Sequence, residues 1–197
     1  MLGQGVPVYA SAMMIGMERQ GLAHVEVKAA ASPLMTGSLF GEALGPLEAF
    51  VAASGGGFVS IRVDPAIRQT LYFKLLFNAC MNPTGALTGF TYGDLVSNPA
   101  TRDLIARLAD ETLAVFAADC AYRPAQDGTS YLRDMLAPAV LARSSGHRSS
   151  MVQDMEAGRR TEIDALNGAV AAMGARLGIA TPTHDAIISL IRARSGA

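Results

Sequence analysis

The stretch Leu71-Tyr72-Phe73-Lys74-Leu75-Leu76-Phe77-Asn78-Ala79-Cys80-Met81-Asn82 places three polar residues four positions apart in a nearly continuous apolar sequence. Four residues of helix drift by only about 40°, so Lys74, Asn78 and Asn82 share one face. The other faces are apolar, which predicts a helix over residues 66–81 that is buried on most sides. A buried lysine is costly unless it is paired or solvated, so the polar line is expected to face a wet pocket.

A second segment of interest runs from Ser149 to Asp164. Ser150 and Glu162 would lie about 18 Å apart on one straight helix, too far to contact one small substrate. Gly158 is expected to end a first short helix, and Thr161 to cap a second, with Asp164 three residues later. Such a reversal of the chain would bring Glu162 and Ser150 towards one site.

Both segments also have simpler interpretations. Lys74 can extend to the surface while the asparagines cap or bridge helices. Glu162 can be a first-turn carboxylate that the helix dipole favours. Arg159 and Arg160 fit an ion-paired or solvated turn better than a phosphate clamp. The residues alone leave these alternatives open.

The rest of the chain predicts an α+β protein with two parts. In the first part, short strands are expected over residues 6–9, 24–28, 34–39 and 58–63, with a helix over 42–53. From residue 66 onward only helices are expected, with Pro83 and Gly85 interrupting the first one. Later helices are predicted over residues 98–121 and 131–143, up to Gly178, and from Thr181-Pro182. We expect residues 1–64 to be the end of a larger α/β unit and residues 65–197 to form a helical domain.

Composition excludes several classes of protein. The net charge of −1 and the pI near 6.3 argue against nucleic-acid binding. No stretch of about 20 residues is purely apolar, and no secretory signal is found, so no membrane span is expected. Cys80 and Cys120 suit a reducing cytoplasm and make neither a disulfide framework nor a zinc cluster. The three histidines lack partners at metal-ligand spacing, so no metal is expected.

Taken together, the motifs resemble a known family. The segments Lys74-Leu75, Asn78-Ala79, Asn82-Pro83 and Ala86-Leu87-Thr88, followed by Ser149-Ser150-Met151, Gly158-Arg159, Thr161-Glu162-Ile163-Asp164 and Asn167-Gly168, resemble the C-terminal domain of ketopantoate reductase (2-dehydropantoate 2-reductase). The resemblance covers about residues 5–195. It implies a helical substrate-binding and dimerisation domain like the C-terminal domain of 6-phosphogluconate dehydrogenase, preceded by a truncated Rossmann-type remnant.

The resemblance also implies a function and roles for five residues. The family reduces ketopantoate to pantoate with NADPH, in pantothenate and coenzyme A synthesis. By resemblance Lys74 is the general acid and Glu162 orients the substrate, whereas Asn78, Asn82 and Ser150 bind it. A homo-oligomer is expected too, because an open sheet edge needs cover.

The chain departs from the family in its nucleotide-binding part. It has no Gly-x-Gly-x-x-Gly turn, and residues 6–63 resemble only the last part of that domain. Hydride transfer needs the cofactor held against the substrate, so this chain is expected to be a truncated form that cannot catalyse alone. Two alternatives remain: a reductase of another 2-oxo acid, and a non-catalytic helical binding or dimerisation module.

Overall fold

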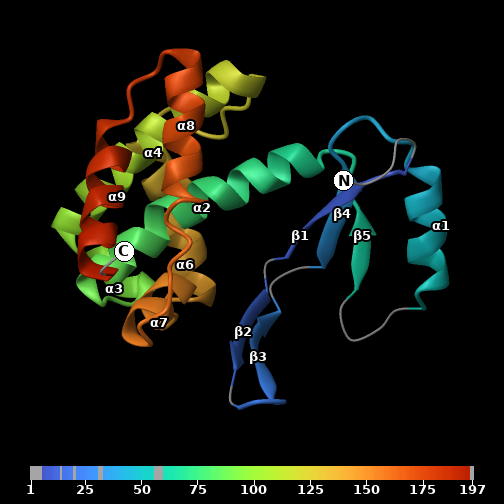
Figure 1. Ribbon diagram of the computed structural model, residues 1–197, viewed down its shortest axis with the longest axis horizontal. Coiled ribbons are helices and arrows are strands. Elements are labelled where there is room, and N and C mark those ends of the chain that lie inside the picture. Colours follow the sequence, from blue (N-terminus) through green and yellow to red (C-terminus); the bar gives the residue numbers. More distant parts are fainter. Residues whose placement is uncertain (1–5, 14, 20, 31–32, 56–59, 196–197) are drawn as a thin grey trace. The chain divides into compact units, whose positions relative to one another are not determined.

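The computed structural model describes residues 6–13, 15–19, 21–30, 33–55 and 60–195 (Figure 1). Its residues divide into two units, Met1–Lys74 and Leu75–Ala197. The first unit holds the strands and one helix, and the second is helical, which confirms the predicted α+β class. The division lies within the helix α2 (Ile67–Thr88), and the expected domain boundary after residue 64 stays a prediction.

The first unit is built on a small mixed sheet with the strand order β1-β4-β5. Strand β1 (Tyr9–Ala12) is antiparallel to β4 (Leu34–Ser38), and β4 is parallel to β5 (Ile61–Val63). Helix α1 (Gly45–Ala53) makes the crossover that two parallel strands require. A separate hairpin joins β2 (Ile15–Arg19) to β3 (Val25–Ala30).

The predictions for this unit hold in part. The strands expected at 24–28 and 34–39 are found as β3 and β4, and the helix expected at 42–53 as α1. The strand expected at 6–9 starts later, at Tyr9, and β2 was not predicted. Residues 58 and 59 of the strand expected at 58–63 lie outside the described residues.

Close backbone packing links β4 to the start of α2. A Cβ on Gly37 would lie 2.1 Å from the Asp64 carbonyl oxygen, so β4 needs a glycine there. The Asp64 carboxylate accepts from the Ala66 backbone N–H at 2.8 Å and from the Thr70 hydroxyl at 2.6 Å. Asp64 therefore satisfies a donor at the beginning of α2, as a capping residue does.

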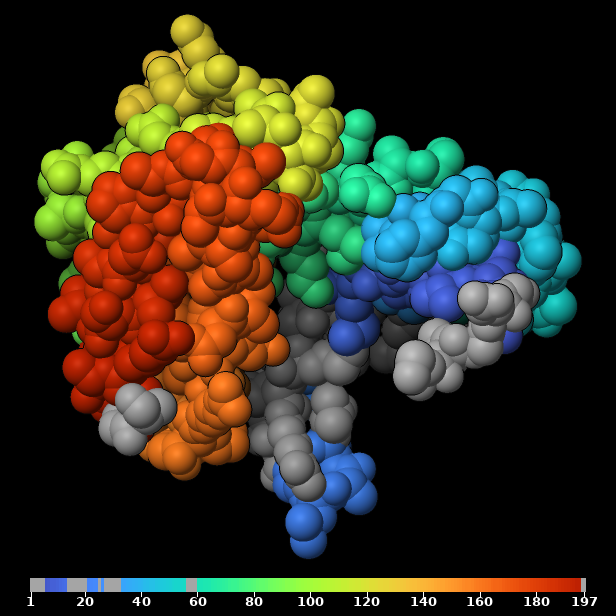
Figure 2. Space-filling view, turned by 45° about the horizontal axis from the view of Figure 1, so that its top comes forward, coloured from blue at the N-terminus to red at the C-terminus, as the bar shows by residue number. Residues whose placement is uncertain are grey.

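The second unit is a bundle around α4 (Pro99–Cys120), which contacts α8 (Asn167–Leu177) and α9 (Pro182–Ser195). In Figure 2, α8 and α9 lie side by side on the surface as the orange-red and red segments. The other elements are α3 (Tyr92–Ser97), α5 (Gly128–Ser130), a π-helix (Tyr131–Leu136), α6 (Ala137–Arg143) and α7 (Ser150–Glu156). Large apolar side chains fill the centre, among them Leu76, Leu108, Phe116, Val170 and Ile187.

Helix α2 continues through Pro83, so the predicted interruption there is wrong. A proline has no N–H, and the carbonyl of Ala79, four residues earlier, therefore loses its helical donor. The side chain of Asn167 supplies the missing donor, with Nδ2 at 2.9 Å from the Ala79 oxygen. A tertiary contact thus replaces the bond that the proline removes.

A buried polar network extends from this point. Asn167 Nδ2 also lies 3.0 Å from Nδ1 of His184, so Nδ1 is the acceptor and the ring proton is on Nε2. Nε2 then donates towards the Thr112 hydroxyl at 3.0 Å and the Leu108 carbonyl at 3.2 Å. Burial lowers the pKa of His184, while the Glu111 carboxylate acts in the opposite direction. The network links α2, α4, α8 and α9 through a neutral imidazole.

Candidate functional site

The polar line of α2 is present as predicted. Lys74, Asn78 and Asn82 follow one another at intervals of four on this helix, Lys74 being the last residue of the first unit. Lys74 and Asn78 are half-buried, and Asn82 is only 3% exposed. The Asn82 amide oxygen accepts a hydrogen bond from the Tyr92 hydroxyl on α3 at 3.2 Å.

Ser150 lies at the start of α7, which is tied to α2. Ser149 is the N-cap of α7, where its hydroxyl accepts from the Val152 N–H at 3.3 Å. The same hydroxyl lies 3.4 Å from the Asn82 carbonyl oxygen, to which it donates. Ser150, the next residue, is exposed. The structure thus places the exposed serine one residue from a direct contact with the polar line.

Glu162 lies in the connection between α7 and α8. Gly158 has a φ of 63° just after α7, as expected of a helix-ending glycine. The second helix starts later than predicted, because α8 begins at Asn167, and the expected cap at Thr161 is wrong. Instead, the Glu162 carbonyl accepts from the N–H groups of Ala165 and Leu166 in a turn. The Glu162 side chain is exposed.

Apolar packing brings the neighbourhoods of Ser150 and Glu162 together. Met151 and Ile163, each the next residue in the chain, belong to one buried cluster. Ala86 of α2, one turn beyond Asn82, is part of the same cluster. The two segments that the sequence separates by twelve positions therefore pack against the same part of α2, as the predicted chain reversal requires.

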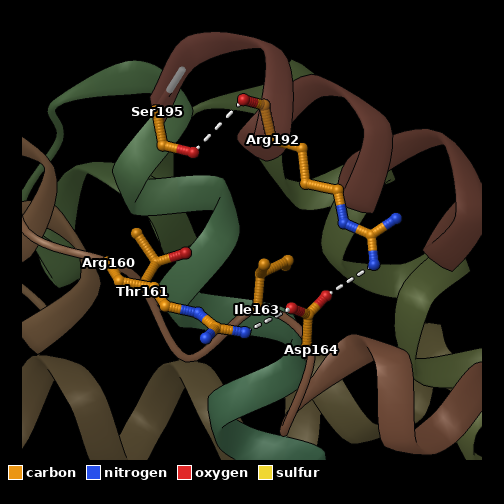
Figure 3. A pocket seen from close by; sticks show the side chains of 6 residues that line it. All are labelled: Arg160, Thr161, Ile163, Asp164, Arg192 and Ser195. Carbon is orange, nitrogen blue, oxygen red and sulfur yellow. Dashed lines mark hydrogen bonds and ion pairs between the residues drawn. The ribbon is translucent and has the colours of Figure 1, made fainter. Parts of the chain in front are cut away.

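A recess of about 220 Å³ lies beside the Glu162 segment, lined by Arg160, Thr161, Ile163, Asp164, Arg192 and Ser195 (Figure 3). Arg192 donates to the Asp164 carboxylate at 2.7 Å and Arg160 does so at 3.5 Å. The bond from Arg192 is the largest cause that lowers the pKa of Asp164. Arg159 is paired with Asp154 at 2.8 Å, so the ion-paired interpretation of Arg159 and Arg160 is confirmed. None of the five predicted site residues lines this recess.

The beginning of α1 does not suit the phosphates of a dinucleotide. In the described part of this unit, α2 follows β5 and its beginning already meets the Asp64 carboxylate, whereas α1 follows β4 and has Pro46 at its beginning. Glu48 lies in its first turn, and Glu42, whose pKa is lowered first of all by the Ser38 hydroxyl, lies just before it. Two carboxylates oppose a pyrophosphate, which needs free N–H groups and positive potential. These residues do not fit the phosphate part of a nicotinamide cofactor.

Sequence reasoning missed Tyr92 and Ser149 as partners of Asn82. Thr91 and Asp94 form a capping box, which starts α3 and places Tyr92 at its first position. The Thr-x-x-Asp spacing was a visible signal for this helix. The contact of Ser149 with Asn82 spans 67 positions and leaves no local pattern. The described helices include none that is long and apolar enough to cross a membrane.

Comparisons with known proteins agree with this arrangement. The model of the ketopantoate reductase PanE/ApbA C-terminal family matches residues 66–195. The 2-dehydropantoate 2-reductase of Aquifex aeolicus is 32% identical over 139 residues, which are 69% of this chain and 43% of the relative. The chain spans about half the length of the curated relatives it matches.

Solved structures extend the likeness to the first unit. The crystal structure of a PanE/ApbA family ketopantoate reductase from Ralstonia eutropha JMP134 has a TM-score of 0.79 and 26% identity, covering 95% of this chain and 59% of that one. A ternary structure of D-mandelate dehydrogenase with NADH and anilino(oxo)acetate shares the fold, with a TM-score of 0.83 at 20% identity, covering 95% and 60%. On the match of its helical part to the family model, this chain belongs to the ketopantoate reductase family.

Proposed function

We propose that this chain is the substrate-binding part of an NADPH-dependent reductase that converts ketopantoate, or a close 2-oxo acid, into the 2-hydroxy acid. The observation that carries the proposal is the line Lys74, Asn78 and Asn82 on α2, with Ser150 beginning the helix that is tied to Asn82. These groups offer a cation, amides and a hydroxyl to an anionic carbonyl compound. The family of the chain makes this chemistry the first candidate.

The role proposed for each residue follows from the chemistry of its side chain. The Lys74 ammonium donates a proton to the carbonyl oxygen, where negative charge develops as hydride reaches the carbon. Asn78, Asn82 and Ser150 bind the substrate, because amide N–H groups and a hydroxyl can donate to its oxygens. Glu162 accepts a hydrogen bond from a substrate hydroxyl and so fixes its orientation. Each role is transferred residue by residue from the family motif.

The hydride donor in this proposal is a nicotinamide cofactor. The D-mandelate dehydrogenase that shares the fold holds NADH, which supports this cofactor class. The carboxylates at the start of α1 oppose a pyrophosphate. We therefore propose that this chain binds the substrate and does not turn over NADPH alone.

Self-association and a reducing, cytoplasmic setting complete the proposal. The described sheet has β1 and β5 as its edge strands, and unpaired edges favour association with another chain. A solved structure with a similar fold is that of a dimeric ketopantoate reductase from Staphylococcus aureus. Cys80 and Cys120 are both free thiols, which fits a reducing compartment. Sedimentation velocity on the purified chain measures the association directly.

The chain provides its own control for the test of Lys74, because it has only two lysines, Lys28 and Lys74. Calorimetry should show ketopantoate binding to the purified chain and to Lys28→Ala, with a loss of about tenfold or more in Lys74→Ala. That size follows from a charged hydrogen bond, which contributes about 1.5–3 kcal/mol. Equal affinity of Lys74→Ala and Lys28→Ala would overturn the role of Lys74.

A second measurement tests the assignment of the cofactor. NADPH oxidation with ketopantoate is followed for the same three proteins, alone. No turnover together with measurable ketopantoate binding is the expected result. Turnover by the chain alone would show that its residues hold the cofactor after all, and absence of ketopantoate binding would refute the proposed substrate.

A further inference from the structure

The hydrogen bond between Tyr92 and Asn82 joins two side chains that are almost fully enclosed. Tyr92 is 7% exposed and Asn82 is 3% exposed, and both belong to the helical unit. The Tyr92 hydroxyl donates to Oδ1 of Asn82 at 3.2 Å. An amide whose oxygen is held in this way has a defined orientation, and the two N–H groups of Nδ2 are left to donate elsewhere.

The direction of this bond does not change with pH over the range in which proteins are stable. Burial raises the pKa of Tyr92, so its hydroxyl keeps the proton that it donates. In the structure this hydroxyl donates to Oδ1 of Asn82, so Nδ2 takes no part in the bond with Tyr92.

Tyr92 can impose an orientation because its own position is fixed from several sides. Its backbone N–H donates to the His147 carbonyl at 2.8 Å. Its ring meets the rings of Phe77 and His147 edge to face, with centroids 5.5 Å and 5.0 Å away. The backbone of Asn82 is held as well, by the hydroxyl of Ser149. The pair is thus preorganised before any ligand arrives, which lowers the cost of binding.

We propose that Tyr92 is a positioning residue for substrate binding: by holding Oδ1 of Asn82 it directs Nδ2 to donate to the carboxylate of the 2-oxo acid. The inference rests on the proposed function, in which Asn82 binds substrate. It adds the partner that orients Asn82 and names the substrate group that Asn82 recognises. A carboxylate accepts hydrogen bonds only, so an Asn82 side chain turned with its oxygen outward would repel it.

The test compares two tyrosine variants by ligand binding. Tyr92→Phe keeps the ring contacts and removes the hydroxyl, and Tyr131→Phe removes the hydroxyl of another buried tyrosine in the same unit. Calorimetry measures the affinity of each full chain for ketopantoate and for its methyl ester, which lacks the negative carboxylate. We expect Tyr92→Phe to lose about tenfold or more in ketopantoate affinity, the size of a hydrogen bond to a charged group. The ester and Tyr131→Phe should show little change.

A second variant separates orientation from folding. Asn82→Asp keeps an oxygen for the Tyr92 hydroxyl and replaces the donor by an anionic oxygen, so ketopantoate binding should be lost while the urea unfolding midpoint shows that the fold is kept. Unchanged ketopantoate affinity in Tyr92→Phe overturns the positioning role and leaves the proposed function intact. An equal loss for ketopantoate and ester also overturns it, because that pattern is expected of a purely structural tie. No binding by the parent chain refutes the proposed function itself.

Discussion

Replacing Asn167 by alanine should destabilise the helical unit by about 2–4 kcal/mol. The change removes the donor to the Ala79 carbonyl at 2.9 Å and the donor to His184 Nδ1 at 3.0 Å. Each acceptor is then buried without a partner, which costs about 1–3 kcal/mol. Part of this cost is recovered, because Oδ1 of Asn167 is itself buried without a hydrogen-bond partner and is deleted too.

The same reasoning predicts a coupling with Pro83. Pro83→Ala supplies a backbone N–H for the Ala79 carbonyl, so that carbonyl no longer depends on Asn167. Asn167→Ala should therefore cost about 1 kcal/mol less in the Pro83→Ala background than in the parent chain. Urea unfolding at pH 7.5, followed by far-ultraviolet circular dichroism, gives the four free energies of the cycle. The proposed role of Asn167 would be refuted if Asn167→Ala alone cost less than about 1 kcal/mol. Strict additivity of the two substitutions would refute it as well, because the Ala79 carbonyl would then not couple them.

Two further predictions concern packing and protonation. Gly128→Ala should cost about 1–3 kcal/mol in urea unfolding, because its Cβ would lie 1.9 Å from the Ala106 carbonyl oxygen. Gly146→Ala, whose Cβ would meet nothing within 4 Å, should be nearly neutral, and equal effects would contradict the packing argument. The folded-state pKa of His184 is depressed, so the unfolded chain binds more protons below the ordinary histidine pKa of about 6.5. The free energy of unfolding should be fully retained above that pH and fall below it, by at most about 1.4 kcal/mol per pH unit, and His184→Gln should remove this part of the slope.

The helical elements could be predicted where a local signal fixes them. Asn98 followed by Pro99 opens α4, and the Asn98 side chain does accept from the N–H groups of Ala100 and Thr101. Gly178 ends α8 with a φ of 71°, as its position in the sequence suggested. These features depend on a few neighbouring residues, and so the sequence is sufficient to recognise them.

The errors arise where distant residues decide the local structure. Pro83 remains inside α2 because Asn167, 88 positions after Ala79, donates to the Ala79 carbonyl. α8 starts later than predicted because Ile163 is buried among residues of α2 and α7. Its packing there determines the conformation of the segment that precedes α8. A capping pattern at Thr161 is a weak preference of about 1 kcal/mol, and burial of an isoleucine exceeds it.

The candidate site shows the same division. The four-residue spacing of Lys74, Asn78 and Asn82 follows from helix geometry and was predictable. The contact of Ser149 with Asn82 and the bond from Tyr92 depend on tertiary packing, and no local pattern indicates them. The residues that bind were therefore easier to find than those that orient them.

The two cysteine thiols differ in burial, so their reactivity can measure the unfolding of the helical bundle. Cys80 lies fully enclosed in α2, where burial raises its pKa and so suppresses the reactive thiolate. Cys120, at the end of α4, is only half-buried. A thiol reagent should consequently modify Cys120 in the native protein and reach Cys80 only when the bundle opens. The chain contains no tryptophan, so tryptophan fluorescence cannot follow its unfolding. The rate at which a thiol reagent increases the mass at Cys80 measures the rate of opening instead.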